Sequence, residues 1–139
     1  MKKIVLLFFG MFLLTGCTKN LTCTKEETES GVKNITQVTA KYNDKEIKKL
    51  DLYLEMELVN EKETDKETFD FSTTVLESFY DEYSEEGITV KETKEDKKYA
   101  LNINYKKEKM SNLKRILNVK MSTGAELKKS LERDNYVCK

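Results

Sequence analysis

Residues 46–59, EIKKLDLYLEMELV, alternate between apolar and polar side chains more regularly than any other part of the sequence. Side chains of a β-strand point alternately to its two faces, so this pattern predicts a strand with one buried and one solvated face. The expected buried side chains are Leu50, Leu52, Leu54, Met56 and Leu58. A shorter alternating run at 34–43, followed by a turn at Asn43-Asp44, predicts the partner strand of an antiparallel hairpin.

A different spacing follows this hairpin. Thr64 and Glu67 match a capping box, which predicts the start of a helix. Apolar and small side chains then recur three and four residues apart, as expected of one buried helix face. They are Phe69, Ser72, Val75, Leu76, Phe79, Tyr80 and Tyr83. Gly87 is placed to end this helix in the left-handed conformation.

The second half of the chain repeats this order. Residues 88–94 and 99–105 predict a second hairpin, and a second capping box at Thr123 and Glu126 predicts a final helix. Residues 106–122 fit either a short helix or an irregular packed loop. The expected fold is therefore α+β in ββαββα order, with an antiparallel sheet of about four strands and helices on one face.

The N-terminus carries the features of an export signal. Lys2 and Lys3 precede an apolar run at 4–14, which is too short for the roughly 20 residues that span a bilayer. The run leads into Leu14-Thr15-Gly16-Cys17, which looks like a bacterial lipobox. In such motifs the thiol of the Cys is lipidated, and cleavage leaves this Cys as the mature N-terminus. The alternative is an ordinary secretory signal with an incidental cysteine.

This interpretation divides the chain into three parts. Residues 1–16 are the predicted lipoprotein signal peptide, 17–22 the lipidated tether and 23–139 a single α+β domain. Fatty acyl chains such as palmitate on Cys17 would anchor the protein to the membrane without spanning it. The expected location is the extracytoplasmic face of the bacterial cell membrane.

Two further cysteines, Cys23 and Cys138, lie near the two ends of the mature chain. An even pair in an exported chain favours a structural disulfide. Zinc binding is a weaker alternative, because the chain has no histidine to complete a site. A redox role is also weaker, because the two residues do not form a C-x-x-C motif.

Composition argues against several classes of function. Cleavage would remove two of the 25 basic residues and leave 23 against 25 acidic ones, which argues against nucleic acid as a partner. The chain has no histidine, the commonest general base and metal ligand. It also lacks the common nucleotide, protease and hydrolase motifs. We therefore predict no catalytic residues, no cofactor and no metal.

Two acidic clusters and one tyrosine are candidate sites. The clusters, at 26–29 and 81–86, lack the spacing of a calcium loop, and solvated surface explains them better. Most of the seven tyrosines occupy positions expected to be buried. Tyr53 is predicted to lie on the polar sheet face and is a candidate surface contact. Its expected neighbours are Thr39, Lys41, Asp51, Glu55, Asn102 and Asn104.

The sequence resembles the YehR-like family of small bacterial lipoproteins of unknown function. The similar features are LTGC at 14–17, TCTK at 22–25, the alternating LDLYLEMEL and the ending LKKSLERDNYVCK. This resemblance implies a ββαββα-type fold and a bond between Cys23 and Cys138. It implies no activity.

These observations predict a lipid-anchored, non-enzymatic binding or interaction domain, whose partner is an unknown protein or small solute. One alternative is a carboxylate-dependent enzyme of the cell envelope, which requires two carboxylates converging in a pocket with at least one partly desolvated. The other is a structural accessory subunit of a membrane complex.

Overall fold

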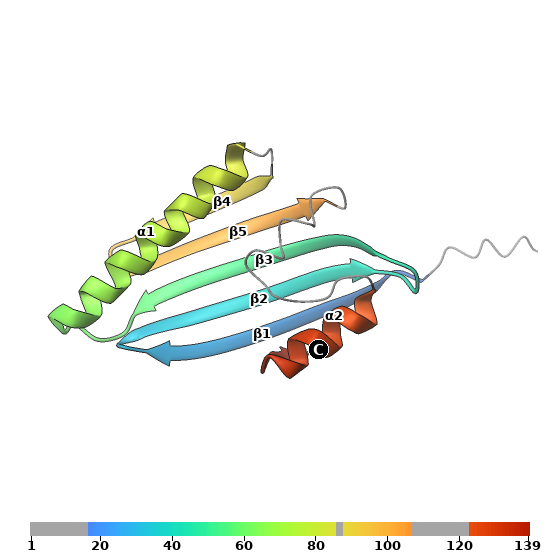
Figure 1. The fold of residues 1–139 in the computed structure, drawn as a ribbon, viewed down its shortest axis with the longest axis horizontal. Coiled ribbons are helices and arrows are strands. Elements are labelled where there is room, and N and C mark those ends of the chain that lie inside the picture. Colours follow the sequence, from blue (N-terminus) through green and yellow to red (C-terminus); the bar gives the residue numbers. More distant parts are fainter. Residues whose placement is uncertain (1–16, 86–87, 107–122) are drawn as a thin grey trace, which may run out of the picture.

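A computed structural model describes residues 17–85, 88–106 and 123–139 of the chain. All strand pairings within it are antiparallel, and the sheet order is β4-β5-β3-β2-β1-β6 (Figure 1). The elements are β1 (Lys19–Glu29), β2 (Val32–Tyr42), β3 (Ile47–Leu58), α1 (Glu63–Glu85), β4 (Thr89–Glu95), β5 (Lys98–Lys106), α2 (Gly124–Arg133) and β6 (Val137–Cys138).

The α+β class is confirmed, but the predicted strand number and order are wrong. The sheet has six strands rather than about four, because β1 and β6 extend it beyond β2, on one side of the two expected hairpins. A strand that begins after Cys23 and reaches Thr28 is also expected from the sequence, and β1 contains these residues. β1 shows no long alternation, because only Leu21 and Cys23 of its side chains are buried. β6 has only two residues, too few to show any periodicity. β1 also begins at Lys19, within the segment predicted to be the tether.

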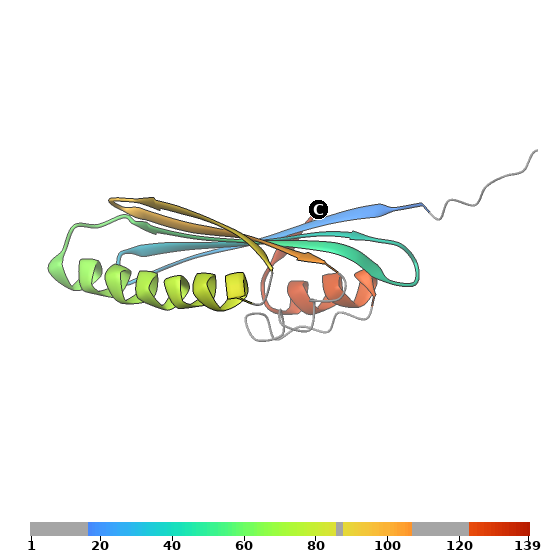
Figure 2. The same cartoon turned by 90° about the horizontal axis from the view of Figure 1, so that it is seen from above.

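Both helices lie on the same face of the sheet, the inner face (Figure 2). Inward side chains from neighbouring strands line up in rows across it. One such row joins Cys23, Val38, Leu52 and Ile103, all fully buried. The alternation of residues 46–59 therefore predicts the buried face of β3 correctly, since all five expected side chains lie in the core.

α1 begins before the predicted capping box. The carbonyl of Lys62 accepts hydrogen bonds from the backbone N–H groups of Asp65 and Lys66, so Thr64 lies inside the first turn rather than at the N-cap. Phe69 and Tyr83 are buried against the sheet, and Leu76, Phe79 and Tyr80 pack partly against the core. Val75 does not belong to the buried face as predicted, because it is 40% exposed.

α2 covers the opposite end of the sheet. Its predicted N-cap is confirmed, since the Thr123 side chain accepts a 3.2 Å hydrogen bond from the backbone N–H of Glu126. Leu127 and Leu131 are fully buried. Gly124 meets the ring of Tyr42 so closely that a Cβ atom there would lie 2.1 Å from Tyr42 Cδ2.

The chain ends beside the strand that begins the domain. Cys23 and Cys138 are paired across β1 and β6, and their sulfur atoms lie 1.99 Å apart, at disulfide distance. Backbone hydrogen bonds of 2.8 and 3.1 Å join the next pair, Thr22 and Lys139. These contacts add β6 to the edge of the sheet, and the two cysteines lie 115 positions apart in sequence.

Three sequence-based predictions fall outside the described residues. They are the signal peptide at 1–16, the helix end at Gly87 and the structure of 107–122. Lys106, at the start of the ambiguous segment, ends β5.

Candidate functional site

Tyr53 lies on the outer face of the sheet, opposite to the helices. The strand register places it in a row of outward residues that crosses all six strands. From β6 to β4 the row is Val137, Thr24, Gln37, Tyr53, Asn102 and Lys91. Asn102 is the neighbour of Tyr53 on β5 as predicted, but on β2 the paired residue is Gln37, whereas the predicted Thr39 and Lys41 pair with Asp51 and Lys49. The role of Tyr53 in binding stays a prediction.

The Tyr53 hydroxyl donates a hydrogen bond to Glu55, which also forms a 2.9 Å ion pair with Lys98. Glu55 is only 8% exposed, although it lies on the face that no described helix covers. Burial alone would raise the pKa of Glu55, but the hydrogen bonds from Tyr53 and Lys98 outweigh it, so the pKa lies below its ordinary value. Burial and the same carboxylate raise the pKa of Tyr53. The outer face thus contains a preorganised polar cluster of Tyr53, Glu55 and Lys98.

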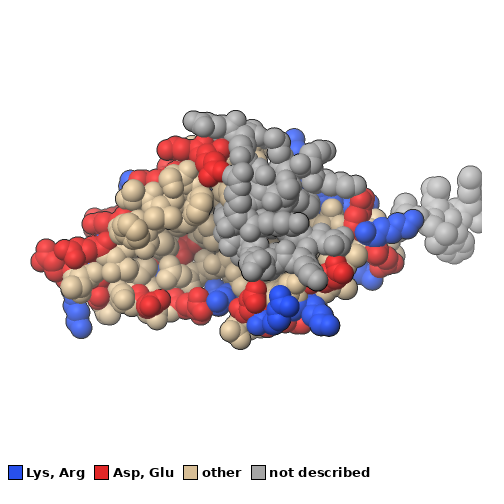
Figure 3. Space-filling model, viewed as in Figure 1, with Lys and Arg blue, Asp and Glu red and all other residues tan. Residues whose placement is uncertain are grey.

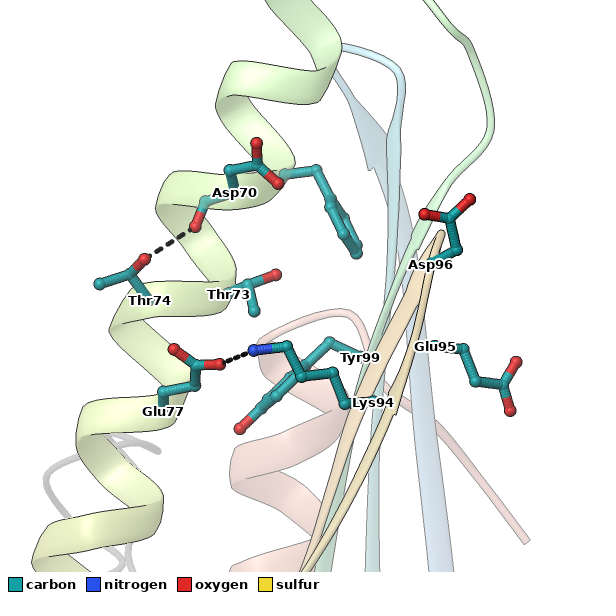
Figure 4. Close-up of a pocket in the computed structure, with 9 residues that line it drawn as sticks. Asp70, Thr73, Thr74, Glu77, Lys94, Glu95, Asp96 and Tyr99 are labelled. Carbon is teal, nitrogen blue, oxygen red and sulfur yellow. Dashed lines mark hydrogen bonds and ion pairs between the residues drawn. The ribbon is translucent and has the colours of Figure 1, made fainter.

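A concave feature lies elsewhere, between α1 and the turn that joins β4 to β5 (Figure 4). This hollow, here called the α1 groove, has a volume of about 530 Å³, which falls in the usual range for small-molecule sites. Its lining residues are Phe69, Asp70, Thr73, Thr74, Glu77, Lys94, Glu95, Asp96 and Tyr99.

Interactions between the two walls fix part of the groove. Lys94 on β4 forms an ion pair with Glu77 on α1. Tyr99 is fully buried, and its hydroxyl donates a 2.7 Å hydrogen bond to Glu92. Burial, followed by the nearby Glu92 carboxylate, raises the pKa of Tyr99 well above its ordinary value. Tyr99 therefore lines the groove as a neutral ring and not as an acid–base group.

Thr73 differs from the other groove residues because its hydroxyl oxygen is buried and has no hydrogen-bond partner among the described residues. The residue is 9% exposed, and its hydroxyl points from α1 toward the β4–β5 side of the groove (Figure 4). A buried hydroxyl without a partner costs about 1–3 kcal/mol. The groove therefore offers a ligand one unused hydrogen-bonding group.

The carboxylates that line the groove differ in their surroundings. Glu77 is neutralised by Lys94, and Glu95 points away from the cavity (Figure 4). Asp70 and Asp96 face the groove region, but both residues are exposed to solvent rather than desolvated. In the described part of the chain, no group of three or more candidate ligands could hold a metal ion.

The two acidic clusters remain at the surface. Glu26 and Glu27 are exposed, and each forms an ion pair with a neighbouring lysine, Lys33 and Lys25 respectively. In the second cluster, Asp81 is exposed on α1. Among the described members of the two clusters, none lines the α1 groove.

Sequence reasoning missed the α1 groove. Its walls come from residues 69–77 and 94–99, which carry no spacing that points to a joint site. The adjacent threonines of α1 were a weak local signal, because threonine is a mediocre helix former. Only the packing of α1 against the hairpin distinguishes Thr73 from Thr74.

No helix within residues 17–85, 88–106 and 123–139 is both long and apolar enough to cross a membrane. No family model, curated protein or solved structure matches the chain. The resemblance to the YehR-like lipoproteins therefore stays a prediction, and the site must be interpreted from its own geometry.

Proposed function

We propose that this protein is a lipid-anchored, extracytoplasmic and non-enzymatic binding protein that holds a small solute in the α1 groove. The observation that carries the proposal is the buried hydroxyl of Thr73, which faces a ligand-sized hollow and has no partner among the described residues. A solute that hydrogen-bonds this oxygen would remove the cost of burying it.

The position of the groove supports a tethered binding role. β1 begins two residues after Cys17, so an acyl group there would hold this end of the sheet close to the membrane. The β4–β5 turn lies at the other end of the strands (Figure 1), about 40 Å away for strands of this length. A lipidated protein would thus present the α1 groove away from the bilayer.

The solute-binding proposal is tested by comparing wild type with Thr73→Val, both purified as lipidated protein in detergent. Valine keeps the shape of threonine and removes the hydroxyl. Native mass spectrometry against a diverse solute library should find at least one ligand that binds wild type and binds the variant more weakly. If every ligand found is indifferent to Thr73→Val, the solute does not bind in the α1 groove.

The anchor is tested separately with Cys17→Ala. Wild type should incorporate a labelled fatty acid in bacterial cells, whereas the variant should stay an unlabelled and uncleaved precursor. Equal labelling of the two proteins would refute the assignment of Cys17 and, with it, the tethered part of the proposal.

A second candidate function is protein binding at the Tyr53–Glu55–Lys98 cluster. It is favoured by the ion pair between the buried Glu55 and the partly exposed Lys98, on a sheet face that no described helix covers. A photo-reactive residue at Asn102, the neighbour of Tyr53 on β5, should then crosslink one defined protein in intact cells. The same residue placed at exposed Lys128 of α2 provides the control, and equal yields from the two positions would argue against a specific outer-face partner.

A further inference from the structure

We propose that the solute bound in the α1 groove is a small linear organic cation, an alkyl chain carrying a primary ammonium group. This inference rests on the proposed solute-binding function and adds the chemical class of the ligand. It follows from the charges of the groove, the hydroxyl of Thr73 and the apolar part of the lining.

The α1 groove is the central hollow of a longer depression. A second hollow of about 440 Å³ adjoins it and shares Phe69, Asp70 and Asp96. Its other lining residues are Leu58, Glu61, Lys66 and Lys97. Together the two hollows form an elongated channel between α1 and the β4–β5 turn, a shape that suits an extended ligand better than a compact one.

Ion pairs mark the two ends of this channel. Lys94 pairs with Glu77 in the central hollow, and Lys97 pairs with Glu61 in the adjoining one. These contacts occupy two of the three lysines that line the channel, and the third, Lys66, lies close enough to Glu61 to lower the pKa of that carboxyl further.

Asp70 and Asp96 lie in the shared part of the channel, and no ion pair to either is found among the described residues. Lys97 lies close enough to Asp96 for the two charges to interact, but its ion pair is with Glu61. Two carboxylates without an ion pair favour a cation and disfavour an anion at the same place.

The surface around the channel is also negatively charged. α1 contains eight acidic residues and one lysine over its 23 positions. Figure 3 shows mostly acidic side chains at the left end of this face, where α1 begins. A field of this kind attracts cationic solutes and repels anionic ones before any contact forms.

Thr73 supplies the directional contact. The hydroxyls of Thr68 and Thr74 donate to the backbone oxygens of Thr64 and Asp70, the usual way in which a helical threonine satisfies itself. Thr73 makes no such bond, although it belongs to the same helix and lies next to Thr74. Its oxygen is therefore free to accept a hydrogen bond from an ammonium N–H.

The remaining lining suits the carbon chain of such a ligand. Phe69 is 6% exposed, and Tyr99, which is fully buried, also lines the hollow. An alkyl chain can lie against the exposed edge of Phe69 while its ammonium group reaches Asp70 or Asp96. A bare divalent metal ion would not use this surface, and the described residues do not gather three ligands for one.

The test is isothermal titration of the lipidated protein in detergent with 1,5-diaminopentane and with 1,5-pentanediol, its neutral counterpart of equal length. The diamine should bind roughly tenfold or more tightly than the diol, and raising the salt concentration should weaken only the diamine. Asp70→Asn and Asp96→Asn should each weaken diamine binding by roughly tenfold, and Thr73→Val by several-fold.

Glu67→Gln is the matched control. It removes the same charge from an exposed position of α1, three residues from Asp70, that lines neither hollow. A loss equal to that of Asp96→Asn would show that only the general acidic field matters, and would overturn the specific site. Equal binding of diol and diamine would overturn the cationic class.

Other results separate this inference from the proposed function. If a neutral or anionic solute binds wild type and is weakened by Thr73→Val, the solute-binding function stands and the cationic class is wrong. If calcium chloride or a lysine-rich peptide binds through Asp70 and Asp96 while the diamine does not, the ligand is not a small organic cation. If no solute of any charge depends on Thr73, both proposals fail.

Discussion

The two ends of the inner sheet face differ in how closely their helices pack against the strands. At the α2 end, a capped helix with two fully buried leucines lies over β1, and the Cys23–Cys138 pair joins the first strand to the last. At the α1 end, the longer helix leaves a hollow against β4 and β5 and buries a hydroxyl without a partner. Figure 2 shows the two helices one after the other along the same face of the sheet.

This difference suggests a division of labour. Cross-links, caps and close packing stabilise the end near Cys17, whereas the far end keeps the incomplete packing that a binding site needs. Stability and binding should therefore respond to different substitutions, and in one case in opposite directions.

The largest effect is expected from removing the disulfide at the α2 end. In the variant Cys23→Ala, Cys138→Ala, the free energy of unfolding should fall by about 2–5 kcal/mol, because the bond closes a long loop in the unfolded chain. Urea denaturation of wild type and variant measures the change. The control is Val137→Ala, at a side chain that is 67% exposed beside Cys138, and it should change stability by under about 0.5 kcal/mol. A similarly small change for the double variant would contradict this account.

Gly124→Ala should destabilise the same end by about 1–3 kcal/mol. The new Cβ would lie 2.1 Å from the Tyr42 ring, so the ring or α2 must move. Alanine is the better helix former, and an increase in stability would therefore mean that the contact yields easily. Thermal unfolding of Gly124→Ala is compared with that of Ala125→Ser, a change at the next, exposed position of α2. The comparison separates the effect of the Tyr42 contact from a general effect on helix stability.

At the α1 end, Thr73→Val should change stability in the opposite direction. It should stabilise the ligand-free protein by about 1 kcal/mol, because it removes a buried hydroxyl that lacks a partner among the described residues. The same substitution should weaken solute binding. Thr74→Val, in contrast, removes a satisfied hydroxyl from an exposed position and should give no gain in stability. Destabilisation by Thr73→Val would indicate that the hydroxyl is already used.

The smallest expected effect concerns pH and the outer face. The hydrogen bond from Tyr53 and the charges of Lys98 and Lys33 hold the pKa of Glu55 below 4.5 in the folded protein, against the effect of burial. The folded state therefore binds this proton less tightly than the unfolded chain. Its contribution to stability is present above pH 4.5 and is lost as the pH falls through the lower folded pKa. Glu55→Gln should flatten this part of the acid-unfolding curve, and an unchanged curve would contradict the assigned shift.

The sequence predicts the centre of the sheet better than its edges. β3 is bordered by strands on both sides and covered on one face, so burial imposes a strict alternation on Leu50 to Leu58. β1 lies near the edge, and beyond Cys23 its side chains are half-buried or exposed, which leaves its pattern mostly polar. β6 forms through contacts with residues more than a hundred positions away, and no local pattern can reveal it.

The candidate sites follow the same rule. Tyr53 could be assigned to the outer face because strand periodicity fixes that face directly. The α1 groove could not be predicted, because it depends on how α1 packs against the β4–β5 turn. The unsatisfied state of Thr73 is likewise a property of the packed structure, since its neighbour Thr74 has the same side chain and a satisfied hydroxyl.

Hydrogen–deuterium exchange with and without 1,5-diaminopentane tests the division between the two ends most directly. If the α1 end holds the ligand, saturating diamine should slow exchange in α1 around residues 69–77 and at the β4–β5 turn, and leave α2 and β6 unchanged. Slower exchange at α2 and β6 with no change in α1 would contradict the account, because it would place the ligand at the end assigned to stability.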